Sequence, residues 1–384
     1  MSWKKVKLGD IATVTSSKRI FARQYTNTGI PFYRQKEIID KKNKLEITEP
    51  LFISKNTYLE IKNKFGAPQK GDLLITAVGV TLGIAYVVRD EEFYFKDGNL
   101  IWLKDFIEEV NSHYIYYWVN SDVGQKSMWS RTIGSAQPAL TIDTIKQFEI
   151  KLPTLNKQNK IADILSNYDN LIENNQKQIK LLEEAAQRLY KEWFVDLHFP
   201  GYENTPITDG IPEGWNKKML GEIVPILTGK KDANFGTQDG NYPFFTCSQE
   251  PIKAPSYSFD TSAVILAGNG DFNVKLYRGK FEAYQRTYVL SPDNLKHLYL
   301  LYYAVNSNMN KLVKGASGST IKFLTKGMIE SIEILIPTEN VLLQFNQLME
   351  EIQRKIEILK KSAVHATEAR DRLLPKLMSG EIEV

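Results

Sequence analysis

The stretch QNKIADILSNYDNLIENNQKQIKLLEEAAQRLYKEWF, residues 158–194, carries apolar side chains at alternating steps of four and three. This spacing predicts one helix with an a/d seam of the coiled-coil type, which only Asn175 interrupts with a polar side chain. The stretch contains no proline or glycine, and at about 1.5 Å per residue the helix would be roughly 55 Å long, more than one compact domain needs. The seam positions are Ile161, Leu165, Tyr168, Ile172, Asn175, Ile179, Leu182, Ala186, Leu189 and Trp193.

A second seam near the C-terminus repeats the first at a constant offset of 184 residues. One offset that holds along a whole helix indicates a duplicated unit whose two long helices pair with each other. A single apolar stripe would fit an ordinary core helix equally well. Pro375 is expected to end the second helix, because proline lacks a backbone donor and clashes with the preceding turn. The second seam consists of Phe345, Met349, Ile352, Ile356, Leu359, Ala363, Ala366, Arg370, Leu373 and Leu377.

The duplication extends to the globular parts of the chain. Residues 3–11 resemble residues 215–223 at an offset of 212, and IKLPT at 150–154 resembles ILIPT at 334–338 at an offset of 184. The interiors differ, and the second is about 28 residues shorter. Similar ends around different interiors suggest one scaffold with two different recognition surfaces. The predicted segments are a first domain at 1–154, a long helix at 155–196, a linker at 197–214, a second domain at 215–338 and a second long helix at 339–384.

Short apolar runs beside glycine turns predict small mixed α/β domains with curved antiparallel sheets. The predicted strands of the first domain are 71–76, 84–88 and 100–103, and an aromatic helix is expected at 113–120. The predicted strands of the second domain are 263–267 and 288–290, and a helix is expected at 298–306.

The composition favours a soluble cytoplasmic protein with no membrane association. The chain has 384 residues, a net charge of +4 and 24% charged residues, so a polyanionic partner is compatible with it but not required. The single cysteine, Cys247, excludes a disulfide framework. The N-terminus has no apolar signal segment, and no apolar run approaches the roughly 18 residues of a membrane span.

Motifs for catalysis and metal binding are missing from the sequence. The four histidines, His113, His198, His297 and His365, are scattered, and with one cysteine they make no zinc-site spacing. The sequence has no Walker phosphate loop, no GxSxG elbow and no Pro-Pro pair of the kind found in the short motif of adenine methyltransferases. We therefore expect a non-catalytic chain with no metal site and no cofactor of its own.

Basic and amide side chains in loops suggest a nucleic-acid interface. Residues 1–50 hold eleven Lys or Arg against five Asp or Glu. Such cations contact phosphates, and Arg34 and Gln35 form a natural pair for reading guanine and adenine edges. A solvated surface explains each residue alone, but polar glycine loops recur at corresponding places in both halves. The candidates are Lys18, Arg19, Arg23, Arg34, Gln35, Arg131, Thr132, Ser135 and Gln137 in the first domain, and Lys230, Lys231, Gln249, Asn269, Gln285, Arg286, Lys314, Ser317, Ser319 and Thr320 in the second.

The order of these segments resembles the specificity subunit of type I restriction-modification systems. The resemblance covers essentially the whole chain and is most specific at 171–201 and at 370–382, which ends RDRLLPKLMSGEI. GDLLITAVGVTLGIAYVV at 71–88 and GSAQPALT at 134–141 match the frame of the target-recognition domains. The implied fold is α+β, with two target-recognition domains in pseudo-twofold relation and two long helices paired as an antiparallel coiled coil.

The resemblance also implies partners. Each domain would read one half of a bipartite site in double-stranded DNA, and the different interiors predict an asymmetric site. The helices would set the spacer and dock two methyltransferase subunits, which bind S-adenosylmethionine and methylate adenine. A restriction subunit would join that complex.

Three alternatives remain open at the level of sequence. A stand-alone restriction nuclease or a fused methyltransferase would need the motifs that are missing. A coiled-coil scaffold or dimerisation protein without DNA specificity would need only the helices. Exposed helix seams could also lead the isolated chain to self-associate.

Overall fold

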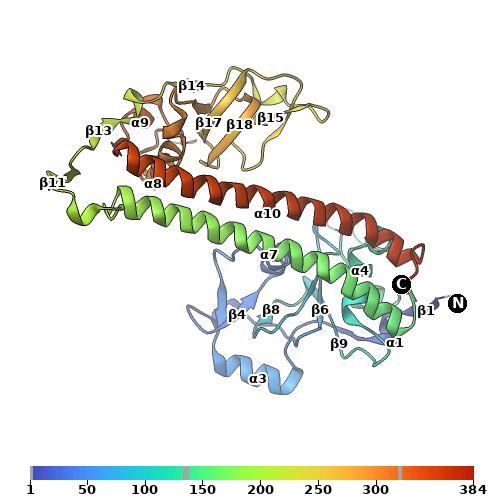
Figure 1. The fold of residues 1–384 in the computed structure, drawn as a ribbon. Coiled ribbons are helices and arrows are strands. Elements are labelled where there is room, and N and C mark those ends of the chain that lie inside the picture. The colour runs from blue at the N-terminus through green and yellow to red at the C-terminus, as the bar shows by residue number, and fades with distance from the viewer. Residues whose placement is uncertain (1–2, 133–137, 319–321) are drawn as a thin grey trace. The chain divides into compact units, whose positions relative to one another are not determined.

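The computed structural model describes residues 3–132, 138–318 and 322–384, which fold into two compact units. Unit 1 contains residues 1–176 and 360–384, and unit 2 contains residues 177–359. The long helices are α7 (Leu155–Phe194) and α10 (Glu339–Ser379). The boundary between the units falls inside both helices, so each unit holds one globular domain and one part of each helix (Figure 1).

The predicted pairing of the two long helices is confirmed. Every seam position is buried or half-buried, and in unit 1 the Asn175 Nδ2 donates to Ser362 Oγ at 2.9 Å. Nearer the start of α7 and the end of α10, Arg370 Nη1 donates to Asp169 Oδ1 at 2.7 Å. Because later residues of α7 meet earlier residues of α10, the helices run antiparallel. The buried amide of Asn175, 3% exposed, therefore has a partner and fixes the register at that point.

The prediction that Pro375 ends the second helix is wrong. Helix α10 continues through Pro375 to Ser379, and Gly380 follows with a φ of 79°. The proline side chain is exposed, and a proline this close to the end of the helix removes a single backbone hydrogen bond. Leu377 and Met378 are buried in the core of unit 1, and this packing holds the last turn in helical form.

The central sheet of unit 1 has the strand order β2-β9-β6-β7, and its pairs are antiparallel. Both faces are covered, because every residue of β6 is buried. Leu73 and Ile75 join the apolar cluster that contains Ile161 and Leu165 of α7, whereas Leu74 faces the aromatic cluster on the other side. The strands are β2 (Thr13–Thr15), β6 (Leu73–Thr76), β7 (Ala85–Val87) and β9 (Leu100–Lys104).

A second sheet in unit 1 has the order β3-β5-β4-β8, in which β4 and β8 are parallel. Helix α2 follows β4, and helix α3 follows β5. Ser54 Oγ accepts the Thr57 N–H at the start of α3, as an N-cap residue does. These elements are β3 (Tyr25–Thr26), β4 (Ile30–Tyr33), α2 (Gln35–Lys42), β5 (Leu51–Ile53), α3 (Lys55–Phe65) and β8 (Tyr94–Phe95).

The first and last strands of each domain pair with each other. In unit 1, β1 (Lys4–Lys7) lies antiparallel to β10 (Glu149–Leu152), which leads directly into α7. In unit 2, β13 (Asn216–Met219) lies antiparallel to β20 (Glu333–Ile336), which leads into α10. The chain therefore enters and leaves each domain at neighbouring points. The remaining helices of unit 1 are α1 (Leu8–Ile11), η1 (Ala22–Gln24), α4 (Ser112–Asn120), α5 (Asp122–Trp129) and α6 (Ile142–Lys146).

Unit 2 contains one six-stranded sheet with the order β14-β19-β17-β18-β15-β16. Strand β18 is a single strand that pairs with β17 along one part and with β15, in parallel, along another. It therefore replaces both β7 and β8 of unit 1. The strands are β14 (Ile226–Thr228), β15 (Tyr242–Phe245), β16 (Ile252–Ala254), β17 (Phe259–Ala267), β18 (Val274–Ala283) and β19 (Thr287–Leu290).

The two domains share one frame, and the difference in length has a clear location. Phe32 and Phe244, which are 212 residues apart, occupy the same place in the parallel pair of each unit. Segments 246–251 and 255–258 of unit 2 stand where unit 1 has α2 and α3. The predicted strands are all found, but the helix expected at 298–306 is longer. It extends to Gly315 because Leu312 continues its buried face.

The other elements of unit 2 connect this frame to the helices. They are η2 (Tyr202–Asn204), β11 (Ile207–Thr208), β12 (Ile211–Pro212), η3 (Leu220–Glu222), η4 (Ala233–Phe235), η5 (Leu295–His297), α8 (Leu298–Gly315) and α9 (Lys326–Glu330). Over residues 3–132, 138–318 and 322–384, none of the helices combines the length and the apolar character that crossing a membrane requires.

Candidate nucleic-acid interface

The turn between β6 and β7 presents a rigid, exposed tip in unit 1. Gly79 and Gly83 have φ values of 79° and 84°, which favour glycine. Thr76 closes the turn, since its backbone N–H donates to Ile84 O at 2.9 Å and its backbone oxygen accepts from Gly83 N at 2.8 Å. Val80, at the tip, is 89% exposed. An exposed apolar side chain on a fixed turn suits contact with the methyl group of thymine.

A second segment is joined to this turn by backbone hydrogen bonds. Gly79 N donates to Pro138 O and Leu140 N donates to Ala77 O, each at 2.8 Å. The segment 138–140 directly follows residues 133–137, which contain the candidates Ser135 and Gln137. Those two residues lie outside the described part of the chain. The described residue that follows this loop, Pro138, therefore lies beside the turn.

The predicted base-reading pair, Arg34 and Gln35, is held within the protein. Gln35 Nε2 donates to Val78 O at 2.8 Å and to Thr81 Oγ1 at 2.9 Å, so this amide joins both sides of the turn between β6 and β7. Arg34 begins α2, and its Nε donates to Glu37 Oε1 at 3.1 Å. The Gln35 amide nitrogen is therefore used within the protein, whereas the Arg34 side chain pairs with Glu37 and stays 38% exposed.

The basic segment after β2 approaches the same edge of the central sheet. Arg19 Nε donates to Asp97 Oδ2 at 2.8 Å, and the loop that holds Asp97 continues to Asn99, whose oxygen accepts from Ala77 N. Lys18 and Arg23 are exposed. Their charged groups lie over aromatic rings, 4.6 Å from the Phe65 centroid for Lys18 and 5.4 Å from the Phe21 centroid for Arg23. These exposed cations are available for phosphate contacts.

The remaining candidates of unit 1 lie against a different part of the domain. Arg131 Nη1 donates to Gln147 O at 3.1 Å, and its guanidinium lies 5.2 Å from the centre of the Phe148 ring. Thr132 Oγ1 donates to Trp129 O at 3.1 Å. These contacts tie Arg131 to the segment before β10.

Unit 2 builds a corresponding turn from different residues. Leu324 N donates to Gly268 O at 2.8 Å and Gly268 N donates to Arg286 O at 2.9 Å, as the equivalent bonds do in unit 1. A Cβ on Gly268 would lie 2.4 Å from Arg286 O, so this position requires glycine. Asn269 pairs with Phe323 across the turn, and Phe323 is 39% exposed.

Two of the candidates of unit 2, Lys231 and Gln285, contact each other through their backbones. Lys231 lies 4.5 Å from the Phe235 ring, and its backbone oxygen accepts from Gln285 N at 3.0 Å. The Gln285 side chain is occupied by Asp232 Oδ1 at 2.8 Å. Ser317 pairs with Phe323. The remaining described candidates are exposed, and they are Lys230, Gln249, Arg286, Lys314 and Ser317. Ser319 and Thr320 lie outside the described residues.

Sequence reasoning missed the exposed apolar residues of the interface. Val80 and Phe323 both lie beside strand-like runs, and for Phe323 nothing in the pattern separates it from core residues. For Val80 the available signal was its position between Gly79 and Gly83, because a residue inside a tight turn cannot reach the core.

An arginine clamp fixes each domain to a long helix. Arg89 Nη1 and Nη2 donate to the two carboxylate oxygens of Glu173 on α7, each at 3.0 Å. In unit 2, Arg278 makes the same two-pronged contact with Glu350 on α10, at 3.0 and 2.9 Å. The strand register places the two arginines at equivalent positions. Two parallel hydrogen bonds fix the orientation of the guanidinium as well as attracting the carboxylate. Each clamp therefore fixes how the domain packs on the helix within its own unit.

The described residues contain no arrangement for metal chemistry, since no group of three His, Cys, Asp or Glu within them could hold an ion. The interface instead offers cations, amides and a few exposed apolar groups on fixed turns. This combination can bind a polyanion and read base edges.

The chain is similar to known proteins in sequence and in fold. The family model described as "Type I restriction modification DNA specificity domain" matches residues 1–184 and 212–362, one match for each repeat. In shape, the chain is similar to a crystal structure of a type I restriction-modification system S subunit from M. genitalium. The TM-score is 0.66 at 16% identity, over 98% of this chain and 96% of that one.

Two curated proteins give similarity in sequence. The EcoDI specificity subunit of Escherichia coli is 40% identical over 168 residues, which is 44% of this chain and 36% of that protein. The MjaIX specificity subunit of Methanocaldococcus jannaschii is 29% identical over 303 residues, which is 72% of this chain and 70% of that protein. The aligned part thus spans about a third of the first relative and about two thirds of the second.

Proposed function

Because the chain belongs to the family of type I restriction-modification DNA specificity proteins, we propose that it selects the DNA sequence on which partner enzymes act. It performs no catalysis itself. Each domain reads one half of a bipartite, asymmetric site through its turn and the loops beside it. The chain itself needs no cofactor, and S-adenosylmethionine is bound by the partner methyltransferase.

One observation carries this proposal above the others. The two units present the same turn, held by the same backbone bonds, but with Val80 at the tip of one and Asn269 and Gly270 in the other. A repeated frame with different exposed groups is what reading two different half-sites requires, whereas a plain scaffold would have no use for it. The half-sites would lie about one helical turn, roughly 34 Å, apart or a multiple of it.

The partners follow from the same proposal. Two methyltransferase subunits dock on the helices, and a restriction subunit completes the complex. Apolar residues outside the seam are available on α10, where Leu343, Ile358 and Val364 are 51%, 53% and 55% exposed. These residues support a docking role, since an exposed apolar group on a paired helix has no use inside the pair.

The proposal is tested by footprinting the chain together with its methyltransferase on a library of duplexes. We expect protection and adenine methylation of one split motif with a spacer of constant length. The chain alone should methylate nothing. Methylation by the purified chain alone would favour a fused methyltransferase, and the absence of any sequence preference in the mixture would reject DNA selection.

Replacing Val80 with aspartate is expected to weaken reading of the first half-site by at least tenfold, or more than about 1.4 kcal/mol. A carboxylate at the exposed tip repels phosphates and cannot contact a thymine methyl group. The measurement is competition binding of the complex with duplexes altered in one half-site at a time. The matched control is Ile107→Asp, because Ile107 is 43% exposed beyond the opposite end of β9. Equal loss at both half-sites would contradict the assignment.

A further inference from the structure

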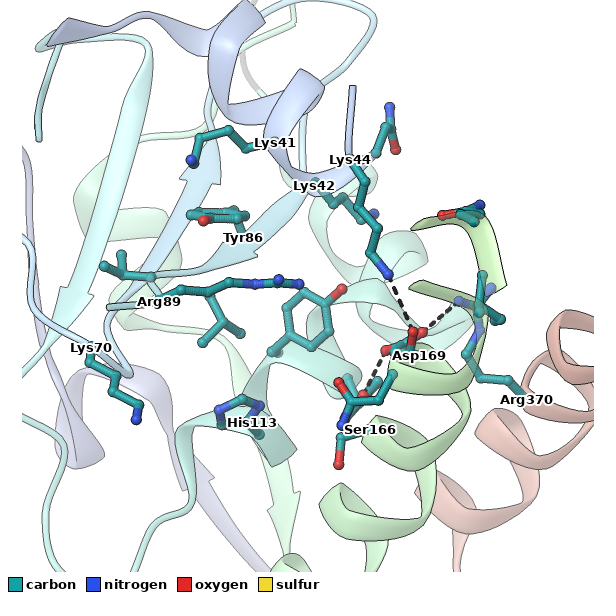
Figure 2. A pocket seen from close by; sticks show the side chains of 18 of the residues that line it. Lys41, Lys42, Lys44, Lys70, Tyr86, Arg89, His113, Ser166, Asp169 and Arg370 are labelled. Atoms are coloured by element: carbon teal, nitrogen blue, oxygen red, sulfur yellow. Dashed lines mark hydrogen bonds and ion pairs between the residues drawn. The ribbon is translucent and has the colours of Figure 1, made fainter. Parts of the chain in front are cut away.

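Unit 1 contains a cavity of about 710 Å³ between α2, the end of β7, α4 and the two long helices. Figure 2 shows that basic side chains surround it. They come from α2 and the turn after it, from the loops flanking the β6–β7 hairpin and from α10, and they are Lys41, Lys42, Lys44, Lys70, Arg89 and Arg370. The volume falls within the range of about 300–1,000 Å³ typical of small-ligand pockets.

Most of these cations already have an acidic partner. Arg89 is paired with Glu173, Arg370 with Asp169 at 2.7 Å, and Lys41 with Glu91 at 2.5 Å. Lys42 and Lys70 differ, because the described residues offer neither of them an ion pair. Asp90 also lines the cavity and Asp371 pairs with Arg370, so among the described residues the six cations face five carboxylates and one positive charge is left over.

Lys42 is the better placed of the two for binding. Its Nζ donates to Asn120 Oδ1 at 2.8 Å, and Asn120 Nδ2 in turn donates to Tyr116 O at 2.9 Å. An ammonium group has three donors, so two of those on Lys42 have no acceptor among the described residues. The side chain is thus fixed in position with donors to spare. A half-buried charge with only a neutral partner costs stability unless an anion joins it.

The cavity also contains flat aromatic surface. Tyr86, Tyr116 and Tyr117 contribute to its lining, and Tyr116 and Tyr117 pack edge to face with centroids 5.0 Å apart. Fixed cations beside aromatic rings suit a ligand that carries phosphate, either alone or attached to a ring.

We propose that this cavity is a phosphate-binding site in which Lys42 is the principal donor. The phosphate is supplied either by a small nucleotide or by the backbone of duplex DNA. The first source is independent of the proposed function, whereas the second rests on it. Helix α2 belongs to unit 1 alone, and segment 246–251 replaces it in unit 2, so the site serves only the first half of the chain.

The charge of Lys42 makes the binding sensitive to pH. Burial lowers the pKa of Lys42 below its usual value, and Arg370 on α10 lowers it further, whereas Asp169 on α7 opposes this effect. Around it, Lys41, Lys44, Lys70 and Arg89 add positive charge, and Glu173 and Asp90 add negative charge. His113 on α4 also lines the cavity, and burial lowers its pKa. Phosphate needs the protonated ammonium, so affinity should fall as the pH rises through this lowered pKa.

The test measures binding of inorganic phosphate and of ADP to the full chain by calorimetry, at pH 8 and at pH 10. Lys42→Met is expected to weaken binding at least tenfold. Lys42→Arg keeps the charge and should retain most of the affinity, and it should lose the fall between the two pH values. Lys64→Met is the control, because Lys64 is an exposed lysine on α3 that does not line the cavity.

A second arm uses the complex with duplex DNA over a range of salt concentrations. If the backbone is the source, Lys42→Met reduces the salt dependence of binding by about one phosphate contact and leaves the half-site preference unchanged. Binding of phosphate or ADP that Lys42→Met abolishes supports the nucleotide source. Failure of both arms, with Lys42→Met folded and unchanged in phosphate, ADP and salt dependence, overturns the site. That outcome leaves DNA selection intact, because sequence preference is measured separately.

Discussion

Replacing Phe345 with alanine is expected to lower the free energy of unfolding by about 3–5 kcal/mol, the usual cost of removing a buried ring from a core. Phe345 is fully buried at a seam position of α10. Its ring lies 4.8 Å from that of Phe194 and 5.9 Å from that of Trp193, both on α7, and 6.2 Å from that of Tyr303 on α8. One side chain therefore joins both long helices to the domain of unit 2, and its loss leaves a cavity where the three meet.

The measurement is urea unfolding, with hydrogen exchange to locate the loss in unit 2. Leu343→Ala is the matched control, because Leu343 lies two residues earlier on the same helix and is 51% exposed. Its effect should stay within about 0.5 kcal/mol. A similar loss for both variants would show that the seam is not the source of stability in this unit.

Replacing Arg34 with alanine is expected to destabilise unit 1 by about 2–3 kcal/mol, and not only to weaken DNA reading. Glu37 is 2% exposed, and its carboxylate accepts from the Arg34 side chain and from the Arg34 backbone N–H at 2.8 Å. Without the guanidinium, a buried carboxylate keeps only backbone donors. The figure lies below the usual cost of breaking a buried pair, because the Arg34 side chain is 38% exposed and water can replace part of it.

The loss should depend on pH in a defined direction. Burial alone would raise the pKa of Glu37, but hydrogen bonds from Arg34 and from backbone N–H groups outweigh it and hold this pKa below its usual value. The stabilisation is therefore present above the unfolded pKa of about 4.3 and is lost as the pH falls through the lower folded pKa. The difference between wild type and Arg34→Ala should shrink in acid. Lys36→Ala is the control, since Lys36 is exposed on the same helix. Unchanged unfolding of Arg34→Ala, with only DNA reading lost, would return Arg34 to the role predicted from sequence.

The long helices were predictable because their signal is repetitive. Each turn adds another apolar residue to the seam, and the offset of 184 tests every position twice. The similar ends of the two domains were predictable for a related reason, since the same short sequence segments recur in both halves. Pro375 shows the limit of such rules, because tertiary packing of Leu377 and Met378 overrides the local preference of one residue.

The sequence could show which loops carry cations, amides and glycine, but it could not show what their side chains contact. It could not show that Arg34 pairs with Glu37 or that Gln35 donates to Val78, since this depends on where the Glu37 carboxylate and the Val78 oxygen lie in space. Nor could it foresee the cavity under α2, which residues more than 300 positions apart in sequence combine to line.

The neighbouring entry and exit strands of each domain have a consequence for how new specificities can arise. Because β1 pairs with β10, and β13 with β20, the interior of each domain begins and ends at two adjacent strands. A different interior can be inserted between those strands without lengthening or rotating the helix that follows. On the proposed function, a graft into one domain is expected to alter one half of the target and to leave the other half unchanged.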